Sequence, residues 1–199
     1  MKENKYDDNI FFQKYSQMSR SQQGLAGAGE WETLRKLLPD FKDKRVLDLG
    51  CGYGWHCIYA MEHGASSVVG VDISHKMLEV AKEKTHFPQV EYKCCAIEDV
   101  EFPEESFDVI LSSLAFHYVA DYEILVKKIY RILKSGGKLV FTVEHPVFTA
   151  YGTQDWYYNE KGEILHFPVD NYYYEGKRTA VFLGEKVTKF HRTLTTYLN

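Results

Sequence analysis

The sequence predicts an α/β protein with a doubly wound, mostly parallel sheet that helices cover on both faces. Short β-branched and leucine-rich runs alternate with helix-like stretches from residue 44 to 144. A glycine-rich turn follows the first of these runs, and capping residues or glycines separate the later ones. Strands that alternate with helices of about 10–15 residues form βαβ units, and such units build parallel sheets.

Five runs are expected to be the strands of this sheet: residues 45–49, 67–71, 90–95, 107–112 and 138–143. Apolar residues at helical spacing predict helices over 53–63 and 122–133. Ser74 is suited to cap a further helix that continues to about Lys84. Gly136-Gly137 is expected to end the helix over 122–133.

The segments on either side of this alternation have simpler patterns. Residues 30–38 predict a short helix that a proline ends, after a polar stretch. Near the other end, residues 178–183 and 187–191 flank Gly184-Glu185-Lys186, which predicts a hairpin with a three-residue loop. Thr193 is placed to cap a final helix.

Composition and charge exclude several functions. The chain has 199 residues with 24 Lys+Arg against 28 Asp+Glu, and its formal charge of −4 gives no general attraction to nucleic acid. No apolar run approaches the roughly 18 residues that cross a membrane, and the N-terminus lacks a secretory signal pattern, so a cytoplasmic location is expected. The four cysteines lack metal-ligand spacing. They are therefore expected to be buried thiols, and no metal site is predicted.

The segment that carries chemistry is Asp48-Leu-Gly-Cys-Gly-Tyr-Gly54, between the first strand and the first helix. Its glycines allow a ligand to approach the backbone, and the start of a helix favours a negative group. Dinucleotide-binding proteins use G-x-G-x-x-G here, but Trp55 occupies the position of the third glycine. Asp72, at the end of the second strand, either accepts hydrogen bonds from both ribose hydroxyls of an adenosine or caps the next helix in competition with Ser74. These features alone fit both a nicotinamide dinucleotide and S-adenosylmethionine.

Four motifs resemble those of class I S-adenosylmethionine-dependent methyltransferases, in the small-molecule branch that is similar to ubiquinone and menaquinone methyltransferases. They are VLDLGCGYG, VVGVDIS, FDVILSSLAFHYV and LKSGGKLVFTVEHP, in order and at normal spacings over residues 44–146. The stretch YSQMSRSQQGLAGAGEW is also similar to the N-terminal cap of one subgroup. The resemblance implies a Rossmann-like, cofactor-binding core over residues 44–145. Cap helices over residues 1–43 precede it, and a substrate-covering segment over residues 146–199 follows it.

The resemblance also implies which residues bind S-adenosylmethionine, which becomes S-adenosylhomocysteine on methyl transfer. Asp48 would orient the methionine amino group, and Asp72 would hold the ribose hydroxyls. The family often has an acid at the position of Ala96, so the chain departs from the pattern there, and Glu98 is the expected substitute. Ile73 and Met77 would enclose the adenine ring, although ordinary core packing explains Met77 equally well. The other implied cofactor-binding residues are Tyr15, Arg20, Gly50, Cys51, Gly52, Gly54, Ile97, Ser113 and Leu114.

Methyl transfer from a sulfonium is an in-line displacement, in which the protein aligns the reacting atoms and excludes water. A base helps when the acceptor carries a proton. Candidates that follow the fourth and fifth strands are His117, Tyr118, Glu144 and His145, with surface or structural roles as the alternative. The covering segment is rich in aromatic residues, which favour an apolar or planar small-molecule acceptor or else form a small separate core: Trp156, Tyr157, Tyr158, Tyr172, Tyr173 and Tyr174.

Complete members of this family continue into a further helix and a two-stranded hairpin, which finish a seven-stranded sheet. The chain ends before those last two strands, so a five-stranded sheet is expected. An unpaired edge strand predicts either a homodimer or marginal solubility. The alternative to an active enzyme is a methyltransferase-like module that binds the cofactor without turnover. A dinucleotide-dependent oxidoreductase is a third alternative, which Trp55 disfavours.

Overall fold

The structure, a computed structural model, describes residues 3–151 and 155–199 of the chain. The chain divides into two compact units. One unit, which we call the sheet unit, comprises Met1–Phe116 and Asp121–Thr142. The other, which we call the hairpin unit, comprises His117–Ala120 and Val143–Asn199.

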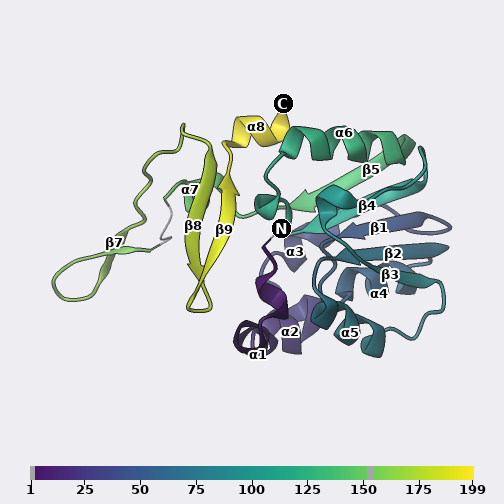
Figure 1. Ribbon diagram of the computed structural model, residues 1–199, viewed down its shortest axis with the longest axis horizontal. Helices are drawn as coiled ribbons and strands as arrows, with labels where there is room; N and C mark the ends of the chain where they lie inside the picture. The colour runs from purple at the N-terminus through teal and green to yellow at the C-terminus, as the bar shows by residue number, and fades with distance from the viewer. Residues whose placement is uncertain (1–2, 152–154) are drawn as a thin grey trace. The chain divides into compact units, whose positions relative to one another are not determined.

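The sheet unit contains a five-stranded parallel sheet, which confirms the predicted fold class (Figure 1). Its order is β3-β2-β1-β4-β5, so the direction of winding reverses between β1 and β4. Proteins of this architecture bind ligands outside the carboxyl ends of the strands at such a reversal. The strands are β1 (Arg45–Leu49), β2 (Ser67–Asp72), β3 (Val90–Cys94), β4 (Phe107–Ser113) and β5 (Leu133–Thr142).

Helices connect these strands at the places that apolar periodicity predicts. Ser74 caps the helix after β2 as expected, because its Oγ accepts a hydrogen bond from the Met77 N–H at 3.1 Å. The connecting elements are α4 (Trp55–Glu62), α5 (His75–Lys84), η3 (Ile97–Asp99), η4 (Phe116–Tyr118) and α6 (Tyr122–Ile132). Among the described residues, none of the helices has both the length and the apolar character needed to cross a membrane.

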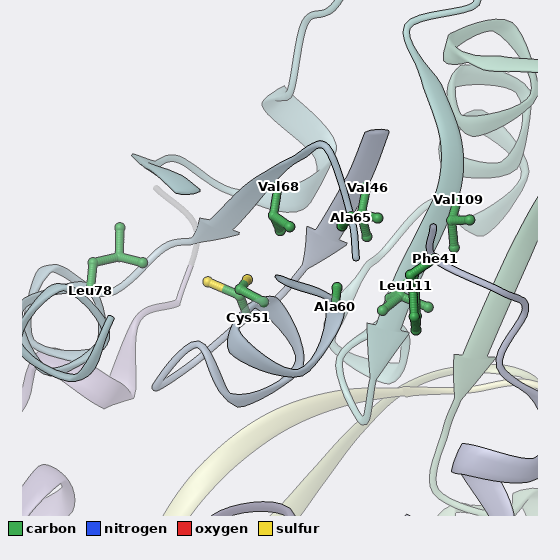
Figure 2. Packing of buried hydrophobic residues seen from close by; sticks show 10 residues of the cluster. Phe41, Val46, Cys51, Ala60, Ala65, Val68, Leu78, Val109 and Leu111 are labelled. Atoms are coloured by element: carbon green, nitrogen blue, oxygen red, sulfur yellow. The ribbon is translucent and has the colours of Figure 1, made fainter. Parts of the chain in front are cut away.

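A hydrophobic core packs against the sheet (Figure 2). β1, β2 and β4 contribute the buried side chains of Val46, Val68 and Val109, and α4 contributes Ala60. Consecutive residues of β1 are buried rather than alternate ones. That pattern arises when helices cover a parallel sheet on both faces, and it explains why the strands read as continuous apolar runs.

The predicted end of the helix over 122–133 is correct to within one residue, but the predicted role of Gly136-Gly137 is wrong. Helix α6 ends at Ile132, and Gly136-Gly137 lies within β5 instead of at the end of the helix. Leu133 is already extended, and it pairs with Phe107 at the start of β4. Pairing with the sheet therefore ends the helix before the glycines are reached.

The polar N-terminal stretch is helical. Asp8 caps the first α-helix, since its Oδ1 accepts hydrogen bonds from the N–H groups of Ile10 and Phe11, each at 2.9 Å. Asp7 accepts a hydrogen bond from Ser74 Oγ at 2.6 Å, which fastens this stretch to the start of α5. The elements are η1 (Lys5–Asp7), α1 (Asn9–Ser16), α2 (Ser19–Gln22), η2 (Gly24–Gly27) and α3 (Trp31–Leu37).

The hairpin unit is built on the antiparallel pair β8 (Gly176–Phe182) and β9 (Glu185–His191). Their turn is Leu183-Gly184, so the predicted three-residue loop is one residue too long. Both turn residues have positive φ, +54° and +80°, as tight two-residue hairpins require. Thr193 caps α8 as expected, with its Oγ1 accepting from the Thr196 N–H at 3.2 Å. The remaining elements are α7 (Pro146–Ala150), β6 (Tyr157–Tyr158), β7 (Ile164–His166) and α8 (Leu194–Leu198).

We predict that the interior strand β4 contributes strongly to the free energy of unfolding. Ile110 in β4 is 0% exposed, so Ile110→Ala leaves a cavity and should lower the free energy of unfolding by about 2–5 kcal/mol. Ile124→Ala is the matched control, because Ile124 on α6 is 60% exposed and should lose less than about 1 kcal/mol. Urea titration of the three proteins measures both changes, and equal losses would contradict the packing described for β4.

Candidate functional site

The three glycines of the turn after β1 share a backbone conformation and differ in their surroundings. Gly50, Gly52 and Gly54 have φ of +81°, +52° and +74°, a backbone region that residues other than glycine rarely adopt. A Cβ at Gly50 would lie 2.5 Å from the Cβ of Ala115, and a Cβ at Gly54 would lie 2.2 Å from the Tyr92 hydroxyl. A Cβ at Gly52 would meet no described atom within 4 Å. The backbone at Gly52 therefore has open space beside it, as a ligand cradle requires.

Asp48, at the end of β1, carries a buried carboxylate oxygen that lacks a partner. Its side chain is 1% exposed, and its Oδ2 accepts a weak hydrogen bond from Cys57 Sγ at 3.5 Å. Its Oδ1 has no hydrogen-bond partner among the described residues. Burial raises the pKa of Asp48 to about 7. Buried polar atoms are normally paired, so this oxygen is suited to a donor that a ligand supplies.

Asp72, at the end of β2, connects the turn to the next helix. Its Oδ2 accepts from the Gly52 N–H and its Oδ1 from the Ser74 N–H, each at 2.9 Å. Burial raises the pKa of Asp72 to about 6, although these two hydrogen bonds work in the opposite direction. The expected competition at the helix start is resolved in favour of Ser74, which caps α5. Each carboxylate oxygen of Asp72 retains acceptor capacity for a ligand hydroxyl.

A pocket lies beside the glycine turn and is closed by the N-terminal helices. Tyr15 and Tyr53 meet edge to face with ring centroids 5.9 Å apart, and burial raises the pKa of Tyr15 to about 12. Arg20 forms an ion pair with Glu30, and Ser113 Oγ donates to the same Glu30 Oε1 at 3.1 Å. The lining residues are Tyr15, Arg20, Ser21, Gly24, Leu25, Ala28, Gly50, Cys51, Gly52, Tyr53, Trp55, His56 and Ser113.

The pocket unites several residues that the sequence predicted from three separate segments. Predicted cofactor residues in its lining are Tyr15, Arg20, Gly50, Cys51, Gly52 and Ser113. Leu114, also predicted, has a strained φ of +53°, and its N–H already donates to Thr142. That N–H is therefore already hydrogen-bonded within the protein, and a ligand contact from Leu114 would have to use another atom.

The residues predicted around adenine lie outside this lining. Met77 is 2% exposed and Ala96 is 7% exposed, so both are core side chains in this structure. Ile73 and Ile97 are half-buried, and the Glu98 carbonyl accepts a hydrogen bond from Lys128 Nζ at 2.8 Å. The sequence assignment of an adenine site to these residues stays a prediction.

Sequence reasoning missed one part of the pocket. In the sequence, Trp55 stands out only as a departure from the dinucleotide-binding pattern. In the structure its ring packs against Gly24, where an added Cβ would lie 3.2 Å from the ring atoms of Trp55. Its Nε1 is buried and has no partner within the described chain. Next to it, burial lowers the pKa of His56 to about 4, so the imidazole is neutral. No local pattern predicts these contacts, because they join α4 to η2 through tertiary packing.

The candidate bases lie in the hairpin unit and differ in their surroundings. His117 is 2% exposed, and its Nδ1 lacks a partner among the residues described. The ring of Tyr118 lies 4.4 Å from the His117 ring. His145 caps α7, since its Nδ1 accepts from the Val147 N–H at 3.1 Å. That nitrogen already has a structural role, which leaves His117 as the histidine with a buried, uncommitted atom.

Comparison with known proteins identifies methyltransferases among the proteins similar to this chain. A family model described as a methyltransferase domain matches residues 47–141. The crystal structure of an S-adenosylmethionine-dependent methyltransferase from Mesorhizobium loti is 41% identical, with a TM-score of 0.82 over 88% of this chain and 80% of that one. A Listeria monocytogenes protein assigned to the same activity is 58% identical, with a TM-score of 0.82 over 85% of this chain and 80% of that one.

One relative found by sequence comparison has a name that states its reaction. The ubiquinone biosynthesis O-methyltransferase of Coxiella burnetii is 36% identical over 112 residues, which are 55% of this chain. The chain spans 47% of that protein's length. These matches favour methyl transfer over the dinucleotide-dependent oxidation that a glycine turn also allows.

We predict that Asp72→Asn weakens the binding of S-adenosylhomocysteine by about tenfold or more, because hydrogen bonds to a charged acceptor are the stronger kind. Calorimetric titration measures the affinity. Asp40→Asn is the control, since Asp40 is exposed and lies away from the pocket lining. The ribose role of Asp72 is wrong if both variants bind the ligand as tightly as the unchanged chain.

The affinity for S-adenosylhomocysteine should also rise with pH between about 5.5 and 8. Burial raises the pKa values of Asp48 and Asp72 to about 7 and about 6, so both carboxyls are largely protonated at the acidic end and ionised at the other. Only the ionised forms attract the ammonium group of the ligand and accept from its hydroxyls fully. Calorimetry across this range tests the sign, and an affinity that falls as the pH rises would contradict it.

Proposed function

Because the chain belongs to the S-adenosylmethionine-dependent methyltransferases, we propose that it transfers a methyl group to a small-molecule acceptor by in-line displacement. The observation that carries this proposal is the pocket beside the glycine turn, which Gly50 and Gly52 line together with residues of the N-terminal helices. S-adenosylmethionine, when bound, supplies an electrophilic methyl group on a cationic sulfur. The residues of this chain hold it, exclude water and present the acceptor.

The cofactor is held, in this proposal, by backbone and carboxylates together. The turn backbone at Gly50 and Gly52 would pack against the methionine portion, where side chains are excluded by the positive φ values. Asp48 would accept from the amino group, and Asp72 from the ribose hydroxyls. Asp72 accepts from the turn at Gly52 and Asp48 precedes the turn in β1, and the raised pKa values of these two carboxyls suit a ligand that brings positive charge and hydroxyl donors.

We propose that residues 1–43 act as a cap and residues 146–199 cover the acceptor. Tyr15 and Arg20 support the first assignment, because both line the pocket. Aromatic pairs in the hairpin unit support the second: Phe148 stacks on Phe167 at 5.2 Å, and Trp156 meets Phe167 edge to face at 5.2 Å. Such rings favour a planar or apolar acceptor. A cytoplasmic location and self-association stay predictions from the sequence.

Of the three predicted catalytic side chains, we infer that His117 contacts the acceptor. Its buried Nδ1 has no partner in the described chain, whereas the corresponding nitrogen of His145 already caps α7. Burial lowers the pKa of His117 to about 4, so a neutral imidazole is present at physiological pH. A neutral imidazole either donates or accepts one hydrogen bond at this atom. Tyr118 has its ring against His117 and would shape the same site.

A turnover screen tests the proposed function. Purified protein is incubated with S-adenosylmethionine and panels of phenols, amines and carboxylates, and S-adenosylhomocysteine formation is measured against a no-acceptor control. At least one acceptor should give product above that control. Binding of S-adenosylhomocysteine with no turnover on any panel would favour a silent cofactor-binding module instead.

We predict different effects for the two histidines on the accepted substrate. His117→Gln should lower kcat/KM by about tenfold or more, because it removes a group that contacts the acceptor. His145→Gln should change kcat/KM less, since a glutamine oxygen can still accept at the start of α7. Steady-state kinetics of both variants, with thermal melts to compare folding, measure the difference. The reverse order would show that His145 is the acceptor-side residue.

A further inference from the structure

The start of helix α5 is occupied by a carboxylate from the N-terminal stretch. Asp7 Oδ1 accepts from Ser74 Oγ at 2.6 Å and from the Lys76 N–H at 3.1 Å, and its Oδ2 accepts from the His75 N–H at 3.4 Å. The first N–H groups of a helix have no partner within the helix and carry partial positive charge, so they attract an anion. In this protein the anion is Asp7, although Asp7 and Ser74 are 67 positions apart in the chain.

Asp7 and Asp72 bind the same serine. The Ser74 N–H donates to Asp72 Oδ1 at 2.9 Å, and the Ser74 hydroxyl donates to Asp7. Burial is the main cause of the raised pKa of Asp72, and the charge of Asp7 adds to it. Burial also acts to raise the pKa of Asp7, but hydrogen bonds from Ser74 and from the helix backbone outweigh it and lower that pKa. Asp7 is therefore ionised at neutral pH, beside the carboxylate to which we assign the ribose.

Neither carboxylate forms an ion pair with a described residue. The groups that donate to Asp7 and Asp72 are neutral backbone N–H, hydroxyl and amide groups. The nearby ammonium group of Lys76 contacts Asn9 Oδ1 instead and lies 5.7 Å from the centre of the Phe12 ring. The charge of Asp7 is thus held by the start of the helix and not by a cation.

The donors at this helix start are already used. The N–H groups of residues 74–77 donate to Asp72, to Asp7 or to Ser74 Oγ. A helix start of this kind binds phosphate when its N–H groups are free. S-adenosylmethionine has two hydroxyls on its ribose, whereas NADP carries a phosphate on one of these oxygens. A phosphate that extended from the ribose toward α5 would meet the carboxylate of Asp7 and no free N–H.

We propose that Asp7 is a specificity-determining residue of the cofactor site, which excludes adenosine ligands that carry a phosphate on the ribose. The proposal rests on the proposed function, because it requires the ribose to bind at Asp72. Asp7 acts in two ways: it uses the N–H groups that would bind a phosphate, and its charge repels one. The ribose hydroxyls of S-adenosylmethionine are neutral, so Asp7 rejects the competitor without weakening the cofactor.

Asp7→Asn tests this role, because it keeps the shape of the side chain and an acceptor oxygen but removes the charge. Calorimetric titration of the full chain at about pH 8 compares S-adenosylhomocysteine with its 2′- and 3′-monophosphates. The unchanged chain should bind S-adenosylhomocysteine at least about tenfold more tightly than either monophosphate. Asp7→Asn should lower this preference at least about fivefold for one of the two, and should bind S-adenosylhomocysteine about as tightly as before.

Glu79→Gln is the matched control. Glu79 lies on the same helix but is exposed and away from its start, so this variant loses one negative charge without changing the contacts of Asp7. The preference should be the same as in the unchanged chain. Thermal melts of the three proteins compare their folding.

Ionic strength gives a second readout that a purely structural role of Asp7 would not produce. Asp7 is only half-buried, so added salt should screen its repulsion of a phosphate. Between about 0.05 and 0.5 M NaCl, the preference of the unchanged chain for S-adenosylhomocysteine should fall. The fall should be smaller in Asp7→Asn, where the repelling charge is gone.

The outcomes separate this proposal from the proposed function. The role of Asp7 is overturned if Asp7→Asn gains no affinity for either monophosphate relative to S-adenosylhomocysteine. An equal loss of affinity for all three ligands also overturns it, because Asp7 would then only hold the N-terminal stretch in place. Failure of the unchanged chain to bind S-adenosylhomocysteine would instead overturn the cofactor site itself.

Discussion

The carboxylate of Asp72 is the contact that joins the glycine turn to the helix after β2. From the end of β2 it accepts from the backbone of Gly52 in the turn and of Ser74 at the start of α5. Asp7 adds a second carboxylate at the same helix start, through Ser74 Oγ and the Lys76 N–H, and so fixes the N-terminal helices there. A buried carboxylate is costly without such donors, so Asp72 holds the turn and the helix together, while Asp7 joins the N-terminal stretch to the same helix.

Two carboxylates of the sheet unit adjoin its glycine turn. Burial raises the pKa values of Asp48 and Asp72 to about 7 and about 6, and Asp48 Oδ1 has no hydrogen-bond partner among the described residues. On our proposal, Asp48 accepts from the amino group of S-adenosylmethionine and Asp72 accepts from its ribose hydroxyls. The ionised carboxylates then favour a cationic ligand, whose positive charge disappears when the methyl group leaves the sulfur.

The parts of this structure that local sequence determines were predictable, and the parts that tertiary contacts determine were not. Each strand of the sheet was visible as an apolar run, and Ser74 and Thr193 were visible as caps, because these signals act over three or four residues. The predicted stop at Gly136-Gly137 is wrong, since Leu133 already pairs with Phe107 in a strand that is distant in sequence. The place of Trp55 in the pocket lining could not be predicted either, because the ring packs against Gly24 of a different helix.

The methyltransferase family model covers residues 47–141 and ends before Glu144 and Lys189. A shared cofactor explains a shared turn and shared strands, since the same ligand imposes the same constraints on every member. On the function proposed above, residues that contact the acceptor are instead expected in the hairpin unit, which contains His117 and Val143–Asn199. In that unit Lys189 is 2% exposed and its Nζ lies 2.6 Å from Glu144 Oε1. Such a buried pair stabilises a fold only weakly, so the free energy of unfolding alone does not account for a lysine at this position of β9.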